Sequence, residues 1–436
     1  MSEKVRYYLE QSVPELEDLK KKRLFEKQEI TMIMRRRTDF EHRIQGRGSQ
    51  PRDFLKYSEF ELNLEKLRKK RFARLSKVGI IDTEPSISDW AGTRRILFIF
   101  DRATRRYPGD LELWSQYLKF AKSNGAIKVI YKVYSRLLQL QPRNVEAWLS
   151  AAKYEFETNA NAKGARVLFQ RGLRLNPESL QLWLSYAQFE LTYISKLLAR
   201  RKVLGLITEK QQQDEQESEQ EKLAKALSKS VTGTEDEDFN NDLIELPTTN
   251  TTDSMKDQLN HLPEVEMNML GNPETNPALK GDVALTIFDL CIPTLLKYIP
   301  EYSTLIKKDD KTFEIAYKFF TLFDNFEELN RDYLNYHILN YLQTNYPKDL
   351  RTLLIDITLP IRHVTISNSN LSENLQLSVN KFIAYKLKLL DLQEKDTLTN
   401  MFVNQLTNQF LNDDEESRSE AVDALLKAII KKCRTI

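Results

Sequence analysis

The stretch "LWLSYAQFE", residues 182–190, places Trp183, Tyr186 and Phe189 three positions apart. Two similar stretches lie upstream, "LWSQYLKFA" at 113–121 and "AWLSAAKYE" at 147–155. The tryptophans of the three stretches are separated by 34 and then 35 residues. Residues three or four positions apart lie on one side of a helix, so each stretch predicts a helix with an aromatic stripe.

Prolines recur with the same period. The apolar segments "RILFIFDRATRRYP", "VIYKVYSRLLQLQP" and "ARVLFQRGLRLNP" end at Pro108, Pro142 and Pro177, again 34 and 35 residues apart. Because proline cannot continue a helix, each one ends a second helix before the next aromatic helix begins. The repeat unit is therefore predicted to be a helix, a turn, a second helix and a terminating proline.

Further stretches extend the repeat toward the N-terminus. "FLKYSEFE" at 54–61 has the same form, and "SDWAGTRR" around Trp90 is interpreted as a degraded start of the unit that ends at Pro108. This gives roughly five stacked units between residues ~50 and ~200, more than the ~3 that a stable core of such repeats needs. The predicted repeat core comprises Phe54, Tyr57, Phe60, Trp114, Tyr117, Trp148, Tyr154, Phe169, Trp183, Tyr186 and Phe189.

The unit resembles a known repeat family. A period of about 34 residues with W-x-x-Y-x-x-F-E in the first helix, and an aromatic residue two positions before an arginine in the second, resembles the half-a-TPR (HAT) repeat. The ordinary tetratricopeptide repeat would show W-x-x-L-G-x-x-Y instead, and Tyr117 and Tyr186 occupy its leucine position. Ala151 in the tyrosine position and Ala121 in the glutamate position depart from the HAT pattern. The resemblance implies an all-α, TPR-like solenoid of helical hairpins in a large RNA-processing assembly.

The order of segments outside the repeats narrows the resemblance. "RYYLEQ", "RRRTDFEHR" and "FLKYSEFE", followed later by "ETNPALKGDVALTIFDLC" at 274–291, are similar to the HAT-repeat family of U3 small nucleolar RNA-associated proteins. This resemblance implies a non-enzymatic scaffold of the nucleolar small-subunit processome, a ribonucleoprotein of ribosome biogenesis. Its UTP-B subcomplex would supply WD40-propeller proteins as partners, around U3 small nucleolar RNA and the pre-rRNA, for 18S rRNA maturation. The implied localisation is the nucleus and nucleolus.

Two other functions remain open at this point. One is a HAT-repeat scaffold in pre-mRNA splicing or 3′-end processing. The other is direct RNA binding through a basic N-terminal arm, whose candidate contact residues are Arg35, Arg36, Arg37, Arg43 and Arg47. Arginines suit bidentate phosphate binding, but the same residues can dock on an acidic protein surface or form a solvated helix face. Without an RRM, KH or zinc-knuckle signature, contact with RNA is expected to be indirect or non-specific.

Basic and acidic residues are distributed unevenly along the chain. Residues 1–205 contain 41 Lys and Arg against 24 Asp and Glu, residues 206–282 contain 6 against 18, and residues 283–436 contain 18 against 21. The polar, acidic middle has the composition of a disordered insertion. The predicted organisation is an N-terminal helical arm at 1–50, a HAT-repeat solenoid at 51–207, an acidic, largely disordered linker at 208–272 and a C-terminal helical-repeat domain at 273–436.

Signatures of enzymes and of metal sites are missing from the sequence. The two cysteines, Cys291 and Cys433, stand far apart, which excludes a disulfide framework or a cysteine-based zinc site. The sequence contains no H-E-x-x-H, G-x-G-x-x-G, G-x-x-x-x-G-K-[ST] or G-x-S-x-G pattern. It begins without the apolar core of a signal peptide and has no run of ~18 apolar residues. We therefore expect a soluble intracellular protein that is not an enzyme, binds no membrane and needs no cofactor or metal.

Overall fold

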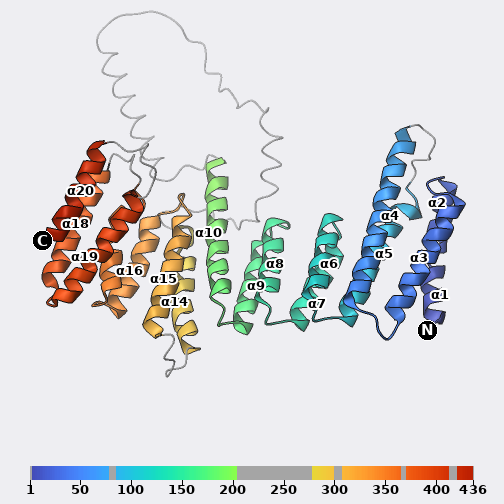
Figure 1. The fold of residues 1–436 in the computed structure, drawn as a ribbon, viewed down its shortest axis with the longest axis horizontal. Coiled ribbons are helices and arrows are strands. Elements are labelled where there is room, and N and C mark those ends of the chain that lie inside the picture. Colours follow the sequence, from blue (N-terminus) through green and yellow to red (C-terminus); the bar gives the residue numbers. More distant parts are fainter. Residues whose placement is uncertain are drawn as a thin grey trace, which may run out of the picture. The chain divides into compact units, whose positions relative to one another are not determined.

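The computed structural model describes residues 2–77, 85–203, 277–298, 307–364, 370–411 and 420–435. Every regular element in these ranges is a helix, and the helices follow one another along the chain as hairpins (Figure 1). The prediction of an all-α fold built from HAT-like hairpins is confirmed. The predicted acidic linker at 208–272 lies outside the described residues.

The chain divides into two compact units, Met1–Trp148 and Leu149–Ile436. This division does not coincide with the boundaries that the sequence suggested at residues 50 and 207. The helices on either side of each suggested boundary pack against each other: α3 packs against α4, and α10 packs against α14. Each unit is therefore described by itself.

The first unit is a series of consecutive helices, most of which pack against the next one in the chain. Helix α1 also packs against α3, and α2 packs against α5, so the N-terminal segment is fastened to the hairpins rather than free of them. The helices of this unit are α1 (Ser2–Glu10), α2 (Val13–Lys21), α3 (Lys27–Gln45), α4 (Pro51–Lys77), α5 (Ile87–Arg106), α6 (Leu111–Ser123), α7 (Ile127–Leu140) and the start of α8 (Val145–Glu157).

Helix α5 corrects the interpretation of Trp90. Ser86 and Asp89 form a capping box at its N-terminus, and the helix continues without a break to Arg106. Trp90 therefore lies on the same helix as the segment that ends at Pro108, and it is not the start of a separate first helix. Its side chain is 52% exposed, unlike the repeat tryptophans.

The second unit contains helices from both sides of residues 204–276. Helix α10 packs against α9 before that range and against α14 and α15 after it, so the two parts of the unit share one core. The helices are α9 (Ala162–Leu175), α10 (Leu180–Val203), α13 (Pro277–Lys280), α14 (Asp282–Lys297), α15 (Lys308–Asp324), α16 (Arg331–Asn345), α17 (Leu350–Thr358), α18 (Leu371–Lys388), α19 (Leu392–Leu406) and α20 (Glu420–Thr435).

Gly281 allows α10, α14 and α16 to approach one another. It precedes α14 in a left-handed conformation with φ of 98°, which side chains rarely adopt. A Cβ atom there would lie 3.0 Å from the Leu334 side chain of α16 and 3.6 Å from the Leu191 side chain of α10. The close packing across the two parts of the unit therefore depends on a residue without a side chain.

The boundary between α16 and α17 has the same proline and helix-capping pattern as the earlier repeats. In "NYPKDL" Pro347 follows α16, and two residues later the Asp349 carboxylate accepts a hydrogen bond of 2.9 Å from the Arg351 backbone N–H at the start of α17. Leu353 then stands six residues after the proline, at the place of a repeat tryptophan, and is buried. Beyond it, α17 to α20 enclose a core of leucines and isoleucines together with Phe382, Phe402 and Phe410.

Candidate functional site

One hydrogen bond explains why tryptophan and proline share a period. In three successive repeats the indole Nε1–H donates to the backbone carbonyl of the proline six residues earlier. The pairs are Trp114 with Pro108 (3.0 Å), Trp148 with Pro142 (2.9 Å) and Trp183 with Pro177 (3.0 Å). The proline ends one helix, and the tryptophan of the next helix donates to the proline carbonyl in the turn, which at Pro108 also accepts from the Gln141 side chain at 2.6 Å.

Aromatic stacking joins the helices on either side of three turns between units, two of which are those at Pro108 and Pro177. A ring on the second helix of one unit stacks face to face on the repeat tyrosine of the next unit. The pairs are Phe40 with Tyr57, Phe100 with Tyr117 and Phe169 with Tyr186, with ring centroids 5.1, 5.6 and 5.3 Å apart. Of the predicted core residues, Phe60 is half-buried and the other ten are buried. The predicted aromatic stripe therefore lies in the interior of the hairpins.

Two of the hairpin pairs also carry a buried arginine–glutamate clamp. Arg166, three residues before Phe169, donates from Nε and Nη2 to the Glu190 carboxylate, at 2.8 Å for both contacts. Arg37 stands three residues before Phe40 and donates in the same way to Glu61, at 2.7 and 2.9 Å. Bidentate pairs of this kind are strong and fix the geometry of the two helices.

The repeat around Trp114 lacks both members of the clamp. Leu97 stands three residues before Phe100, and Ala121 occupies the position of Glu61 and Glu190. Because a single buried charge would be left without a partner, loss of both members together is the physically consistent substitution. The alanine that departs from the HAT pattern is thus matched by a leucine on the facing helix.

The arm arginines do not form one surface. Arg35, Arg36, Arg43 and Arg47 are exposed on α3 and just after it, whereas Arg37 is 1% exposed. Its guanidinium pairs with Glu61 and with Glu15, the latter at 3.4 Å. Arg37 was a candidate contact for RNA or a partner; it is excluded from an exposed arginine surface, because its guanidinium faces inward. It braces the first hairpin instead.

Arg37 belongs to a larger buried charge network. Glu15 of α2 also pairs with Arg95 of α5, and Glu41 of α3 accepts from Arg102 of α5 at 2.7 and 2.9 Å. Burial lowers the pKa of Arg37, but the charges of Glu61 and Glu15 outweigh this and hold the pKa above its usual value. Arg37 therefore stays protonated, and the network ties α2, α3, α4 and α5 together.

Tyr57 lies against the same network. Burial, together with the nearby charges of Glu61 and Glu41, raises its pKa well above the ordinary value, so the phenol remains neutral. Sequence reasoning gave no role to Glu15, Arg95 or Arg102. The shared spacing of Arg37 before Phe40 and of Arg166 before Phe169 was the one local signal that could have revealed the clamp.

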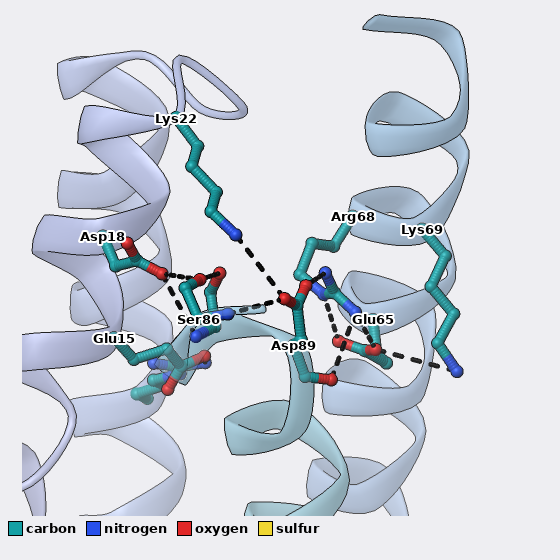
Figure 2. Close-up of polar contacts among 10 residues, drawn as sticks. Glu15, Asp18, Lys22, Glu65, Arg68, Lys69, Ser86 and Asp89 are labelled. Carbon is teal, nitrogen blue, oxygen red and sulfur yellow. Dashed lines mark hydrogen bonds and ion pairs between the residues drawn. The ribbon is translucent and has the colours of Figure 1, made fainter. Parts of the chain in front are cut away.

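A second polar cluster fastens α2 to the start of α5 (Figure 2). The Asp18 carboxylate accepts from the Ser86 hydroxyl and from the Ser88 backbone N–H. Burial raises the pKa of Asp18, but these bonds outweigh it and hold the pKa below its usual value. Lys22 reaches Asp89 from the other side at 3.5 Å.

Arg68 joins the cluster from α4. It pairs with Glu65 on its own helix at 2.8 Å and with Asp89 at 2.9 Å, as Figure 2 shows. A Cβ atom on Gly92 would lie 2.5 Å from Glu65 Oε2, so the glycine leaves room for that carboxylate. The N-terminal arm is therefore held in place by charged side chains from three elements.

Further features of the described ranges concern metal binding, membrane crossing and thiol reactivity. They contain no group of three or more His, Cys, Asp and Glu side chains that could hold a metal ion. Within the same ranges, no helix combines the length and the apolar character that a membrane crossing requires. Cys291 and Cys433 are both buried, and burial raises the pKa of the Cys291 thiol to about 12, so this thiol stays protonated.

Two protein-family models match different parts of the chain. Residues 98–223 match a family described as PRP39 N-terminal HAT repeat, which agrees with the hairpin geometry. Residues 9–95, which hold the clamp of Arg37, the second polar cluster and every member of the larger network except Arg102, match a family described as U3 small nucleolar RNA-associated protein 6.

Curated relatives carry the same name. A U3 small nucleolar RNA-associated protein 6 from Schizosaccharomyces pombe is 41% identical over 213 residues, which cover 49% of this chain and 43% of that protein. The homologue from Mus musculus is 32% identical over 39% of this chain and 28% of its own length. The homologue from Dictyostelium discoideum is 27% identical over 51% of this chain and 36% of its own length. The chain therefore spans less than half the length of these relatives.

Proposed function

We propose that the chain is a non-enzymatic scaffold of a nucleolar pre-ribosomal particle that contains U3 small nucleolar RNA. The match of residues 9–95 to the U3 small nucleolar RNA-associated protein 6 family carries this proposal. The names of the curated relatives support the same particle. Hairpins with sealed aromatic cores also suit a protein that acts by presenting surfaces rather than by turnover.

At finer detail, the proposed particle is the small-subunit processome and the proposed partners are WD40-propeller proteins of its UTP-B subcomplex. In this role the chain holds those proteins near U3 RNA and the pre-rRNA during 18S rRNA maturation, in the nucleolus. The alternative is a HAT scaffold in splicing or 3′-end processing, which the repeat match of residues 98–223 alone would equally allow. The more specific match of residues 9–95 favours the U3 particle.

Affinity purification of the tagged full chain tests this proposal. We expect U3 small nucleolar RNA and other proteins of the same particle to be recovered, at levels well above those from untagged cells. Spliceosomal RNAs measured in the same eluate provide the comparison. Enrichment of spliceosomal RNAs without U3 would favour the alternative particle and would overturn the proposal.

The exposed arm arginines give a second prediction. We expect the purified chain to bind single-stranded RNA weakly, because Arg37 is buried and the Arg36 guanidinium lies over the Phe60 ring. Replacing Arg35, Arg36, Arg43 and Arg47 together by glutamine should then leave RNA affinity nearly unchanged at two salt concentrations. If the arm instead neutralised phosphates, the slope of log affinity against log salt would flatten by roughly 0.7 for each phosphate that the variant no longer neutralises.

A matched variant controls for total charge. It replaces four exposed lysines, Lys56, Lys66, Lys70 and Lys119, by glutamine, and so removes the same charge from other parts of the first unit. Tight RNA binding that the arginine variant loses and the lysine variant keeps would establish the direct RNA-binding function. The expected result is that both variants behave like the wild-type chain toward isolated RNA.

A further inference from the structure

The first unit contains a cavity of about 510 Å³ between α1, α2, α3, α4 and α5. Four arginines and two glutamates line it, and Arg37 also pairs with Glu61 behind the wall, which leaves an excess of one positive charge. Its size lies within the range of roughly 300–1,000 Å³ that is typical of ligand-binding sites. Among the described residues, the buried faces of the later repeats are mainly aromatic and aliphatic, with polar side chains such as Glu155, Asn176 and Glu190 between them.

Two hydrogen-bond donors in the cavity wall have no partner among the described residues. Nη1 of Arg37 is one of them, although the same guanidinium pairs with Glu61 and Glu15 through its other nitrogens. Nε of Arg102 is the other. Leaving a buried charged donor unsatisfied is costly, so both atoms match a group that accepts hydrogen bonds.

The mouth of the cavity is apolar and exposed. Trp90, Ile87 and Phe98 of α5 line it, and their side chains are 52%, 51% and 40% exposed. Arg94 stands beside them, exposed and without an ion-pair partner among the described residues. Tryptophan and arginine are the residue types that most often dominate the energy of protein–protein contacts.

We propose that this cavity binds a short segment of a protein partner in which an Asp or Glu carboxylate is flanked by apolar residues. The carboxylate accepts from Arg37 Nη1 and Arg102 Nε, and the flanking side chains pack on Trp90, Ile87 and Phe98. The excess of arginines over glutamates in the wall provides the charge complementarity. This inference rests on the proposed scaffold function, because it names the chemistry of one partner segment.

An RNA strand fits the same wall less well. Glu15 and Glu41 also line the cavity, so a strand with one phosphate per nucleotide meets more repulsion there than a segment with a single carboxylate. A base stacked on Trp90 would leave both unpartnered donors unused. The proposed segment directs its one carboxylate toward these donors and leaves its apolar neighbours at the mouth.

Binding of defined peptides to the purified full chain tests the proposal. The probes are seven-residue peptides with a central Asp or Glu between Leu, Ile or Phe, and the same peptides with a central Asn or Lys. A ten-nucleotide single-stranded RNA is measured in parallel. We expect selective binding of acidic-centred peptides, weakened at least about 10-fold by Trp90→Ser or by Arg94→Glu.

The two variants change exposed residues, so the fold is retained and circular dichroism verifies it. Arg52→Glu makes the same charge change on an exposed arginine outside the cavity, and Met32→Ser removes an exposed apolar side chain on α3. Both controls should bind peptides like the wild-type chain. Equal binding of Asn- or Lys-centred peptides, no peptide binding, or RNA binding that Trp90→Ser abolishes would each overturn the proposal.

Different experimental results would overturn the proposed function and this inference. Recovery of U3 RNA by the tagged chain, without selective peptide binding, overturns the cavity proposal alone. Selective peptide binding that the Arg94→Glu variant loses, without recovery of U3 RNA, supports the cavity and overturns the assignment of the particle.

Discussion

Replacing Arg37 by methionine is expected to lower the free energy of unfolding by about 3–5 kcal/mol. The substitution leaves Glu61, which is 1% exposed, without the guanidinium that neutralises it, and removes one of the two cationic partners of Glu15. A buried charge that loses its partner costs far more than the ion pair contributes while intact. Urea denaturation followed by circular dichroism measures the change.

Two further variants show whether the loss comes from the unpaired carboxylate. Arg35→Met changes an exposed arginine two residues earlier on the same helix and should alter stability by no more than about 0.5 kcal/mol. The double variant Arg37→Met/Glu61→Met should recover a large part of the loss, because an apolar pair of similar volume avoids the desolvation penalty. An Arg37→Met protein as stable as the wild type would contradict the buried clamp.

Replacing Trp114 by alanine is expected to cost about 3–5 kcal/mol, as for other buried large aromatic side chains. The side chain is 1% exposed, and its loss opens a cavity between α6 and its neighbours and leaves the Pro108 carbonyl without the indole donor. Trp114→Phe keeps most of the ring volume and removes the donor, so a smaller loss of roughly 0.5–1.5 kcal/mol is expected. The same denaturation measurement compares both variants.

Trp90→Ala is the matched control for Trp114→Ala. It removes the same side chain from a position that is 52% exposed, and we expect a change within about 0.5 kcal/mol. Similar losses at the two positions would mean that the 34-residue spacing does not mark the buried tryptophans. The repeat assignment, and the register of every hairpin that depends on it, would then be wrong.

The period of the repeat was predictable because it appears in the spacing of residues that are close together in the sequence. Tryptophan, tyrosine and phenylalanine three residues apart mark one helix side wherever that helix lies, and proline marks its end. Trp90 misled the same reasoning because an isolated tryptophan beside "SDWAGTRR" resembles a repeat start, although it lies on the exposed side of α5. Residue type alone does not reveal which side of a helix a neighbour covers.

The charged groups of the first unit were predictable only in part. In "RRRTDFEHR" three adjacent arginines are equivalent by composition, and only the facing glutamate decides that Arg37 turns inward. The bond between Arg95 and Glu15 joins residues 80 positions apart, and no local pattern connects them. The cavity follows from five helices meeting, so its unpartnered donors become visible only in three dimensions.

The indole–carbonyl bond restricts where this chain can change in length. Trp114 lies six positions after Pro108, and in each of the next two repeats the tryptophan also lies six positions after the proline. The turn inside each hairpin is not tied in this way: residues 124–126 join α6 to α7, while residues 158–161 join α8 to α9. The additional residue of the longer repeat lies in that inner turn. Evolutionary insertions, and engineered ones such as an epitope tag, are therefore tolerated at one end of a hairpin and excluded at the other.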